Sequence, residues 1–222
     1  MAGGRARDAD PKDVEIAAEM PSVVEPMQPT LAKLPFSNPN WLFEQKWDGY
    51  RAICYVHDGQ VRFISRNRKS LTERFPELQG ISESIKAESA ILDGEIVALD
   101  RAGMPCFGAL RSRKVPGCEV VFYAFDLLHL DGQDLTHTPL LNRKKLLKKI
   151  LSKRKAARIR FTDHIVGEGE QLFVELERRQ IEGMVAKRID SEYAGGRTRL
   201  WLKIKTAAGR DEQHRRSEAW QN

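Results

Sequence analysis

Short strand-like runs joined by tight turns constrain the fold of this chain more than any other feature of its sequence. Four runs are rich in β-branched and aromatic residues, and they cover residues 51–56, 61–65, 90–99 and 119–128. The first two are joined across Asp58-Gly59, a pair typical of a two-residue β-hairpin. The last is followed by a similar pair, Asp131-Gly132. The sequence therefore predicts a β-rich fold that contains at least one hairpin.

Helical periodicity is clearest in the second half of the chain. Residues 138–151 begin with Thr138 as a suitable N-cap and Pro139 at the first helical position, and leucines recur on one side. Residues 168–180 carry apolar residues at helical spacing. Strand-like runs follow at 183–189 and 200–205. Helices are therefore expected to flank the strands.

Length and composition predict one packed unit with polar ends. With 222 residues, of which 41% are hydrophobic, the chain can bury one sizeable core or two small lobes that share one. Residues 26–205 are expected to carry the fold. Residues 1–25, with a short helical hint at 11–20, are predicted to be a flexible lead-in, and residues 206–222 a flexible tail.

Charge and cysteine usage indicate a protein of the cytoplasm with an anionic partner. Lys and Arg outnumber Asp and Glu by 37 to 31, which weakly favours nucleic acid. Cys54, Cys106 and Cys118 form neither a CxxC pair nor a zinc-site spacing with histidine, so a disulfide framework or a structural zinc is not expected. No apolar run approaches the roughly 20 residues that span a bilayer, and no secretion signal is recognisable.

Residues suited to phosphoryl chemistry occur in a fixed order along the chain. Lys46 begins the segment Lys46-Trp47-Asp48-Gly49-Tyr50-Arg51, and it is followed by an aromatic residue, two carboxylates and three lysines: Glu95, Phe125, Glu182, Lys187, Lys203 and Lys205. Such a set offers a nitrogen nucleophile, oxygen ligands for magnesium, a platform for a base and positive charge for phosphates. The order suggests a lysine that takes a nucleotide covalently.

Each of these pieces also has a purely structural explanation. The Lys46 segment can be a strand end before an Asp-Gly turn, Glu182-Gly183 can be a helix end, and Phe125 can be core. Strand alternation places Lys203 and Lys205 on one face, where solvated lysines are common, and leaves Leu202 and Ile204 for the core. Because a lysine attacks only when neutral, its reference pKa of about 10.4 has to be offset by burial or by neighbouring cations.

A dense basic run begins within the first predicted helix and continues beyond its end. It contains ten basic residues and no acidic one: Arg143, Lys144, Lys145, Lys148, Lys149, Lys153, Arg154, Lys155, Arg158 and Arg160. A solvated helix face is the simpler interpretation, and contact with a DNA backbone is the alternative.

Taken together, the motifs resemble the adenylation domain of ATP-dependent DNA ligases of the bacterial end-joining type, within the covalent nucleotidyltransferase superfamily. The resemblance covers residues 26–205 and rests on six segments, at 43–51, 65–68, 92–97, 122–128, 182–188 and 201–205. It implies an α+β, ATP-grasp-like ligase adenylation fold, in which two mixed or antiparallel β-sheets are flanked by helices.

The resemblance also implies a role for each residue at the nucleoside end of the site. Lys46 would attack the α-phosphate of ATP, form lysyl-AMP and expel pyrophosphate. Glu44 would read the amino group of adenine, and Phe125 would stack on the base. Arg51 and Glu95 would hold the ribose and its surroundings.

For the phosphate end, the resemblance implies a metal and several cations. Glu95 and Glu182 would place Mg²⁺ or Mn²⁺, and three lysines, Lys187, Lys203 and Lys205, would contact the phosphates. Arg66 would lie near the ribose or the 5′-phosphate of DNA. AMP would pass to that phosphate, and a 3′-hydroxyl would then displace it to seal nicked or broken double-stranded DNA. The implied setting is DNA repair or recombination at the nucleoid of a bacterial cytoplasm.

The chain departs from the family at its C-terminal end. DNA ligases of this kind continue from the 201–205 strand into an oligonucleotide-binding barrel with a further basic motif, whereas this chain stops 17 residues after Lys205. We therefore expect ATP binding, with full sealing dependent on a protein that supplies the missing module. The alternatives are a catalytically incomplete nucleotide- or DNA-binding remnant and an RNA ligase or capping-type nucleotidyltransferase. Glu44 and the 123–128 string favour adenine and DNA.

Overall fold

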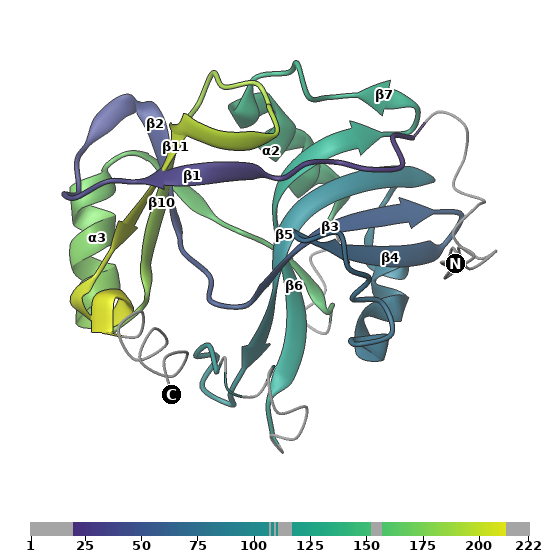
Figure 1. The fold of residues 1–222 in the computed structure, drawn as a ribbon, viewed down its shortest axis with the longest axis horizontal. Helices are drawn as coiled ribbons and strands as arrows, with labels where there is room; N and C mark the ends of the chain where they lie inside the picture. Colours follow the sequence, from purple (N-terminus) through teal and green to yellow (C-terminus); the bar gives the residue numbers. More distant parts are fainter. Residues whose placement is uncertain (1–19, 107, 109, 111–116, 152–156, 212–222) are drawn as a thin grey trace, which may run out of the picture.

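A five-stranded mixed sheet forms one half of the molecule (Figure 1). A computed structural model describes residues 20–106, 108, 110, 117–151 and 157–211 of the chain. The strand order is β1-β11-β10-β2-β9, which are Met27–Leu31, Gly196–Lys205, Gly183–Arg188, Asn38–Gln45 and His164–Gly167. β1 runs parallel to β11, and the other neighbours are antiparallel.

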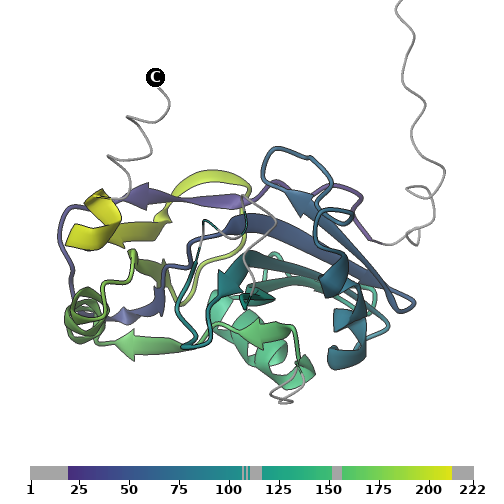
Figure 2. The same ribbon diagram turned by 90° about the horizontal axis from the view of Figure 1, so that it is seen from below.

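A second mixed sheet of six strands faces the first (Figure 2). Its order is β4-β3-β5-β6-β7, with β8 parallel to β6, and these strands are Gln60–Ser65, Tyr50–His57, Ser89–Leu99, Glu119–Leu130, Gln133–Asp134 and Ile159–Phe161. The predicted α+β fold with two mixed sheets is therefore confirmed.

The helices cover the outer faces of the two sheets and leave an inner face between them. α3 (Gly169–Arg178) packs Phe173 and Leu176 against the first sheet, while the 3-10 helix η2 (Pro76–Ser84) and α2 (Leu140–Ile150) pack against the second. A separate apolar cluster lies between the sheets and contains residues from both, among them Leu42, Ile53, Phe125 and Trp201. The molecule is thus layered as helix, sheet, inner core, sheet, helix.

The strands and helices expected from the sequence are present, with small differences at their ends. Asp58 and Gly59 have φ of 46° and 77°, the left-handed pair that a two-residue hairpin turn requires. The predicted N-cap of α2 was wrong. Pro139, not Thr138, occupies the cap, and no side chain hydrogen bonds to the first turn. β1, β2, β7, β8, β9 and η2 were not expected, because they are short or are interrupted by polar residues.

The expected solvated basic face of α2 is only partly correct. Arg143 and Lys144 are fully buried, whereas Lys145, Lys148 and Lys149 are exposed. The buried side of the helix contains Leu140, Arg143, Lys144, Leu147 and Ile150, so the two cations lie within the apolar stripe. Lys153, Arg154 and Lys155 lie outside the described residues.

A few residues beyond each predicted domain limit pack against the fold. Met20 is buried, and the Val24 amide donates to the Tyr55 hydroxyl at 3.1 Å. After β11, Thr206 is buried and residues 207–211 form a helical turn beside α3. The limits 26 and 205 stay predictions. No helix in the described ranges is long and apolar enough to cross a bilayer.

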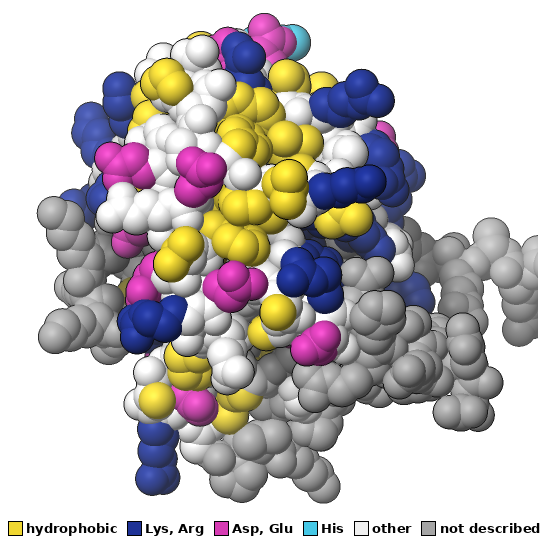
Figure 3. Space-filling model, turned by 90° about the vertical axis from the view of Figure 1, so that its left-hand side faces the viewer, with side chains coloured by type: hydrophobic (Ala, Val, Ile, Leu, Met, Phe, Trp, Pro, Cys, Tyr) yellow, Lys and Arg dark blue, Asp and Glu magenta, His cyan; other side chains and the backbone are white. Residues whose placement is uncertain are grey.

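One end of the molecule presents apolar side chains to the surface. Figure 3 views the end that carries α3, where hydrophobic side chains gather in a band between acidic and basic ones. Leu34 and Val174 are the most exposed large apolar residues described, at 76% and 67%. Neither residue lines the pocket between the sheets.

Candidate active site

A pocket of about 530 Å³ opens between the inner faces of the two sheets. This volume lies within the range of roughly 300–1,000 Å³ that small-molecule sites occupy. Eight of the residues expected at the site line it: Glu44, Lys46, Arg51, Arg66, Glu95, Phe125, Lys187 and Lys203. The sequence therefore brings residues separated by up to 159 positions (203 minus 44) to one cavity.

Lys46 lies in the connection that crosses from the first sheet to the second. Its amide donates to the Gly183 carbonyl, and residues 46–49 then lead from β2 into β3. Gly49 has to be glycine because a Cβ there would clash with the Ile96 carbonyl. The crossing therefore presents the lysine to the pocket between the sheets.

The Lys46 amine is held by a carboxylate. Its Nζ lies 2.5 Å from Glu182 Oε2, and both side chains are largely shielded from solvent. Lys205 Nζ lies 3.7 Å from the other oxygen of Glu182. Glu182 and Lys205 are not part of the pocket lining, so Glu182 contacts Lys46 from outside the cavity and Lys205 contacts Glu182 there.

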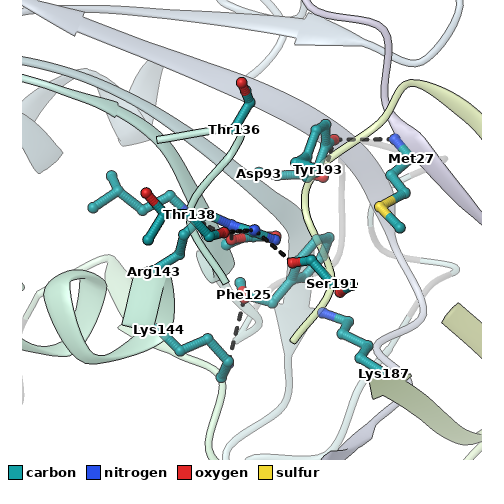
Figure 4. Close-up of polar contacts among 12 residues, drawn as sticks. Met27, Asp93, Phe125, Thr136, Thr138, Arg143, Lys144, Lys187, Ser191 and Tyr193 are labelled. Carbon is teal, nitrogen blue, oxygen red and sulfur yellow. Dashed lines mark hydrogen bonds and ion pairs between the residues drawn. The ribbon is translucent and has the colours of Figure 1, made fainter. Parts of the chain in front are cut away.

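Arg51 is fixed by a buried carboxylate that was not singled out from the sequence. Its guanidinium donates two hydrogen bonds to Asp93, at 2.9 and 2.6 Å, and a third to the Met27 carbonyl. The Tyr193 hydroxyl also donates to Asp93, at 2.6 Å (Figure 4). Burial alone would lower the pKa of Arg51, but Asp93 more than offsets this and raises it. Arg51 is therefore a permanent, oriented cation.

A buried ionic group of three residues forms another part of the lining. Glu44, only 2% exposed, lies between Lys144 Nζ at 2.5 Å and Lys187 Nζ at 2.6 Å. Burial would raise the pKa of Glu44, but the two ammonium groups outweigh it and hold the pKa below its usual value. Burial also lowers the pKa of Lys187, which Glu44 only partly offsets. Glu44 is therefore an ionised acceptor inside the protein.

Two aromatic rings stand beside this group. Phe125 and Trp201 meet edge to face with centroids 6.2 Å apart, and Lys187 Nζ lies 4.2 Å from both centroids. Phe125 is placed here by an irregularity in β6, where the pairing with β5 shifts between Asp93 and Gly94 and passes over residue 125. Such a bulge re-aims a side chain next to a site. The ring is 9% exposed, so it belongs to the core and to the pocket at once.

Glu95 and Lys203, which also line the pocket, have shifted pKa values. Burial raises the pKa of Glu95 to about 7, although Lys46 and Arg51 oppose this. Burial lowers the pKa of Lys203, and the nearby cations Lys46 and Lys205 lower it further. The predicted alternation is confirmed, because Leu202 and Ile204 pack with α3 while Lys203 lines the pocket.

The donor set suits a metal that is shared with a ligand and does not suit a closed protein cage. The described residues contain no group of three or more His, Cys, Asp or Glu side chains that could hold an ion. Magnesium is commonly held by one or two carboxylates together with phosphate oxygens. Glu95 has carboxylate oxygens in the pocket, whereas Glu182 already carries Lys46.

Four residues of the site were not predicted, although the sequence carried signals for two of them. Alternation along β11 places Trp201 on the same face as Lys203, so it could have been expected in the pocket. The burial of Lys144 could have been expected from its place in the apolar stripe of α2. Asp93 lies within the 92–97 segment but has no local signal for an ion pair, and Tyr193 lies in a loop with no recognisable pattern. Trp201 lines the pocket, and the other three support residues that line it.

Comparison with known proteins agrees with this geometry. The family model described as "ATP dependent DNA ligase domain" matches residues 21–205. The multifunctional non-homologous end joining DNA repair protein LigD of Mycobacterium tuberculosis is 38% identical over 166 residues, which are 74% of this chain and 21% of that protein. LigD of Pseudomonas aeruginosa is 32% identical over 91% of this chain and 23% of its own length. The chain thus spans about a fifth of these relatives.

Shorter relatives and solved structures give the same result. The prophage-derived DNA ligase-like protein LigB of Bacillus subtilis is 30% identical over 82% of this chain and 67% of that protein. A structure titled "mycobacterial DNA ligase D complexed with ATP and MES" superimposes with a TM-score of 0.72 and 35% identity, over 82% of this chain and 60% of that one. The ATP complex of the bacteriophage T7 ligase, at 17% identity and a TM-score of 0.53, shares the fold.

Proposed function

The chain belongs to the ATP-dependent DNA ligase domain family, and we propose on that basis that it performs the adenylation step of DNA ligation. Lys46 Nζ attacks the α-phosphorus of ATP, a P–N bond forms, and pyrophosphate leaves with the electrons of the broken P–O bond. The observation that carries the proposal is the position of Lys46 in a pocket that also contains an aromatic ring, a fixed arginine and a carboxylate.

The residues around Lys46 explain how its amine can react. The ammonium has to lose a proton before it attacks, and the nearest acceptor is Glu182 Oε2 at 2.5 Å. Lys203 adds a second positive charge to the pocket, which attracts the triphosphate. The protein therefore contributes mainly by position and charge.

The other predicted residues are assigned by their place in the pocket. Phe125 supports the base, Arg51 and Glu95 hold the ribose, and Arg66 lies at the mouth near the ribose or the DNA 5′-phosphate. Glu95 would hold Mg²⁺ or Mn²⁺, which neutralises charge on the phosphates when bound. Lys205 reaches the phosphates only if it leaves Glu182.

Nicked double-stranded DNA is the proposed acceptor of AMP, and a bacterial cytoplasm is the proposed setting. The relative from Mycobacterium tuberculosis, which is named a non-homologous end joining DNA repair protein, supports the choice of DNA. The exposed lysines of α2 support a contact with the DNA backbone. If Lys148 and Lys149 bind phosphates, the charge reversals Lys148→Glu and Lys149→Glu together should reduce the slope of log affinity against log salt by about 2. A slope like that of the wild type, or a similar loss in the control Lys33→Glu, an exposed lysine after β1 in the first sheet, would leave the solvated face as the correct interpretation.

Transfer of label from nucleotide to protein tests the adenylation step. The chain is incubated with magnesium and α-labelled ATP or GTP and separated on a denaturing gel. Label from ATP alone is expected, with none in Lys46→Ala and normal labelling in Lys86→Ala, an exposed lysine after η2 that does not line the pocket. Label from GTP would indicate a capping-type enzyme. Absence of label in the wild type would indicate a catalytically incomplete remnant.

A further inference from the structure

The two lysines that bind Glu44 differ in how completely their hydrogen-bonding groups are used. Lys144, fully buried on α2, donates to Glu44 Oε1 at 2.5 Å and to the Thr162 carbonyl at 3.0 Å. It also donates to the Phe125 carbonyl at 3.3 Å (Figure 4). An ammonium has three N–H groups, so all of them are occupied. Lys144 is therefore locked in one orientation with its charge directed at Glu44.

Lys187 retains N–H groups that are free to meet a ligand. It contacts Glu44 Oε2 at 2.6 Å, and within the described part of the chain no carbonyl or hydroxyl takes up its remaining hydrogens. Its ammonium lies over the rings of Phe125 and Trp201, and it lines the pocket, which Lys144 does not. The pocket thus presents a carboxylate acceptor beside an ammonium donor.

Glu44 and Lys187 lie where the edge of a purine base would contact the protein. Glu44 and Lys46 are two residues apart on one strand and its continuation, so both side chains point to the same face, about 7 Å apart along the backbone. Lys187 connects Glu44 to Phe125, because its ammonium contacts the Glu44 carboxylate and lies over the Phe125 ring. A base that lies against Phe125 therefore presents its edge to the acceptor and donor pair.

We propose that Lys144 is a positioning residue that holds Glu44 as an acceptor for the 6-amino group of adenine, and so makes the pocket prefer ATP to purine nucleotides with a 6-oxo group. The proposal rests on the proposed adenylating function and on the adenine contact that the resemblance implies for Glu44, and it adds the residue that positions that carboxylate. A 6-amino group donates to a carboxylate, whereas a 6-oxo group places a second acceptor against it. Lys187, which was expected at the phosphates, would here supply the donor for the neighbouring ring nitrogen of adenine, because it lies beside Glu44 and Phe125.

Without Lys144, Glu44 keeps only Lys187 as its counter-ion. The remaining pair is still neutral overall, so Lys144→Met should fold, but Lys187 then serves the carboxylate alone and Oε1 can rotate or take a proton. Either change removes the fixed acceptor. Lys144→Arg keeps the charge and should restore part of the preference. Lys145→Met, one residue along α2 and exposed, is the matched control.

Equilibrium binding of three nucleotides tests the proposal without any chemical step. Dissociation constants are measured in EDTA for ATP, for inosine triphosphate with its 6-oxo group, and for purine riboside triphosphate, which carries only hydrogen at that position. Lys144→Met should reduce the preference for ATP over inosine triphosphate by about tenfold or more. Binding of purine riboside triphosphate should change less than about threefold, and Lys145→Met should match the wild type.

The outcomes separate this proposal from the proposed function. Equal weakening of all three nucleotides in Lys144→Met would mean that the lysine only supports the fold, and would overturn the positioning role while adenylation stands. An unchanged preference would overturn it as well. Failure of the wild type to bind any of the three would overturn both proposals.

Discussion

The side chains around Lys46 are arranged as alternating charges, and each of them limits what its neighbour can do. Glu182 holds the amine at 2.5 Å, and Lys205 holds the other oxygen of Glu182 at 3.7 Å. Lys203, on the pocket side, has a lowered pKa because it is buried near these cations. The nucleophile is thus oriented by an acid, and cations near it can attract the phosphates.

Glu95 gives a test of this charge balance through stability. Burial raises its pKa to about 7 from the ordinary value of 4.5, so between those values the folded chain retains a proton that the unfolded chain has lost. Stability therefore falls as the pH rises through this window. Glu95→Gln, which is always neutral, should be more stable than the wild type by about 1 to 3 kcal/mol at pH 8, with the gain shrinking toward zero by pH 4.

Urea unfolding of both proteins at the two pH values measures this difference. The same substitution removes the carboxylate proposed to hold the metal, so the gain in stability should accompany a loss of adenylation. If the difference in unfolding free energy between Glu95→Gln and the wild type is the same at pH 8 and pH 4, then Glu95 ionises normally.

Among the elements, the paired strands β5 and β6 determine how the site is built. Gly94 lies between Asp93 and Glu95, and a Cβ at this position would clash with the Phe122 ring and the Tyr123 carbonyl. The close approach of the two strands accompanies the shift in pairing that places Phe125 in the pocket. One glycine therefore supports the positions of both carboxylates and the ring.

Gly94→Ala should destabilise the chain by about 1 to 3 kcal/mol, because the backbone carbonyl cannot move aside as a flexible side chain would. Gly80→Ala in η2 is the matched control, since a Cβ there meets nothing within 4 Å, and it should be neutral or slightly stabilising. Thermal or urea unfolding of the two variants provides the comparison. Similar effects at both positions would contradict the assigned role of Gly94.

The sequence predicted those elements whose pattern is local. Asp58-Gly59 identified the β3–β4 hairpin, and alternation in β11 separated Leu202 and Ile204 from Lys203. β9 and β8 escaped notice because three- or four-residue strands are defined by their partners. The site motifs could be identified from the sequence in order. Their assembly in one pocket depends on residues 46–49, which cross from the first sheet to the second.

Arg143 and Lys144 show why the remainder of the site could not be predicted. In a run of ten basic residues, each one taken alone is expected in solvent, and only the acidic partners, Asp126 and Glu44, bring these two inside. Those partners lie 17 and 100 residues away in sequence, so no local pattern connects them. Helical spacing alone was the available signal.

On the scale of the whole molecule, three buried carboxylates join the two sheets. Asp93 on β5 binds Tyr193 from the loop after β10, Asp126 on β6 binds Arg143, and Glu44 on β2 binds Lys144. Arg143 also donates to the Ser191 carbonyl at 2.9 Å, in that same loop. Through Tyr193, Arg143 and Lys144, each carboxylate thus contributes to a connection between the first sheet, or the loop after β10, and the second sheet or α2.

Removal of one partner of the Arg143–Asp126 pair should lower the free energy of unfolding far more than removal of both. Arg143 and Asp126 are both fully buried, so Arg143→Met leaves an unpaired buried carboxylate and should cost about 3 to 5 kcal/mol. The double variant Arg143→Met with Asp126→Asn should recover a substantial part of that loss. Urea unfolding measures both. A single variant within about 1 kcal/mol of the wild type would contradict a joining role for this pair.

The central claim is that the nitrogen of Lys46 forms a covalent bond to the phosphorus of AMP. Peptide mapping by mass spectrometry, after incubation of the chain with ATP and magnesium, locates any adenylate directly. The account predicts an AMP adduct on the peptide that contains Lys46, and on that residue within it. An adduct on another lysine, or a chain that remains unmodified while it binds ATP, would contradict it.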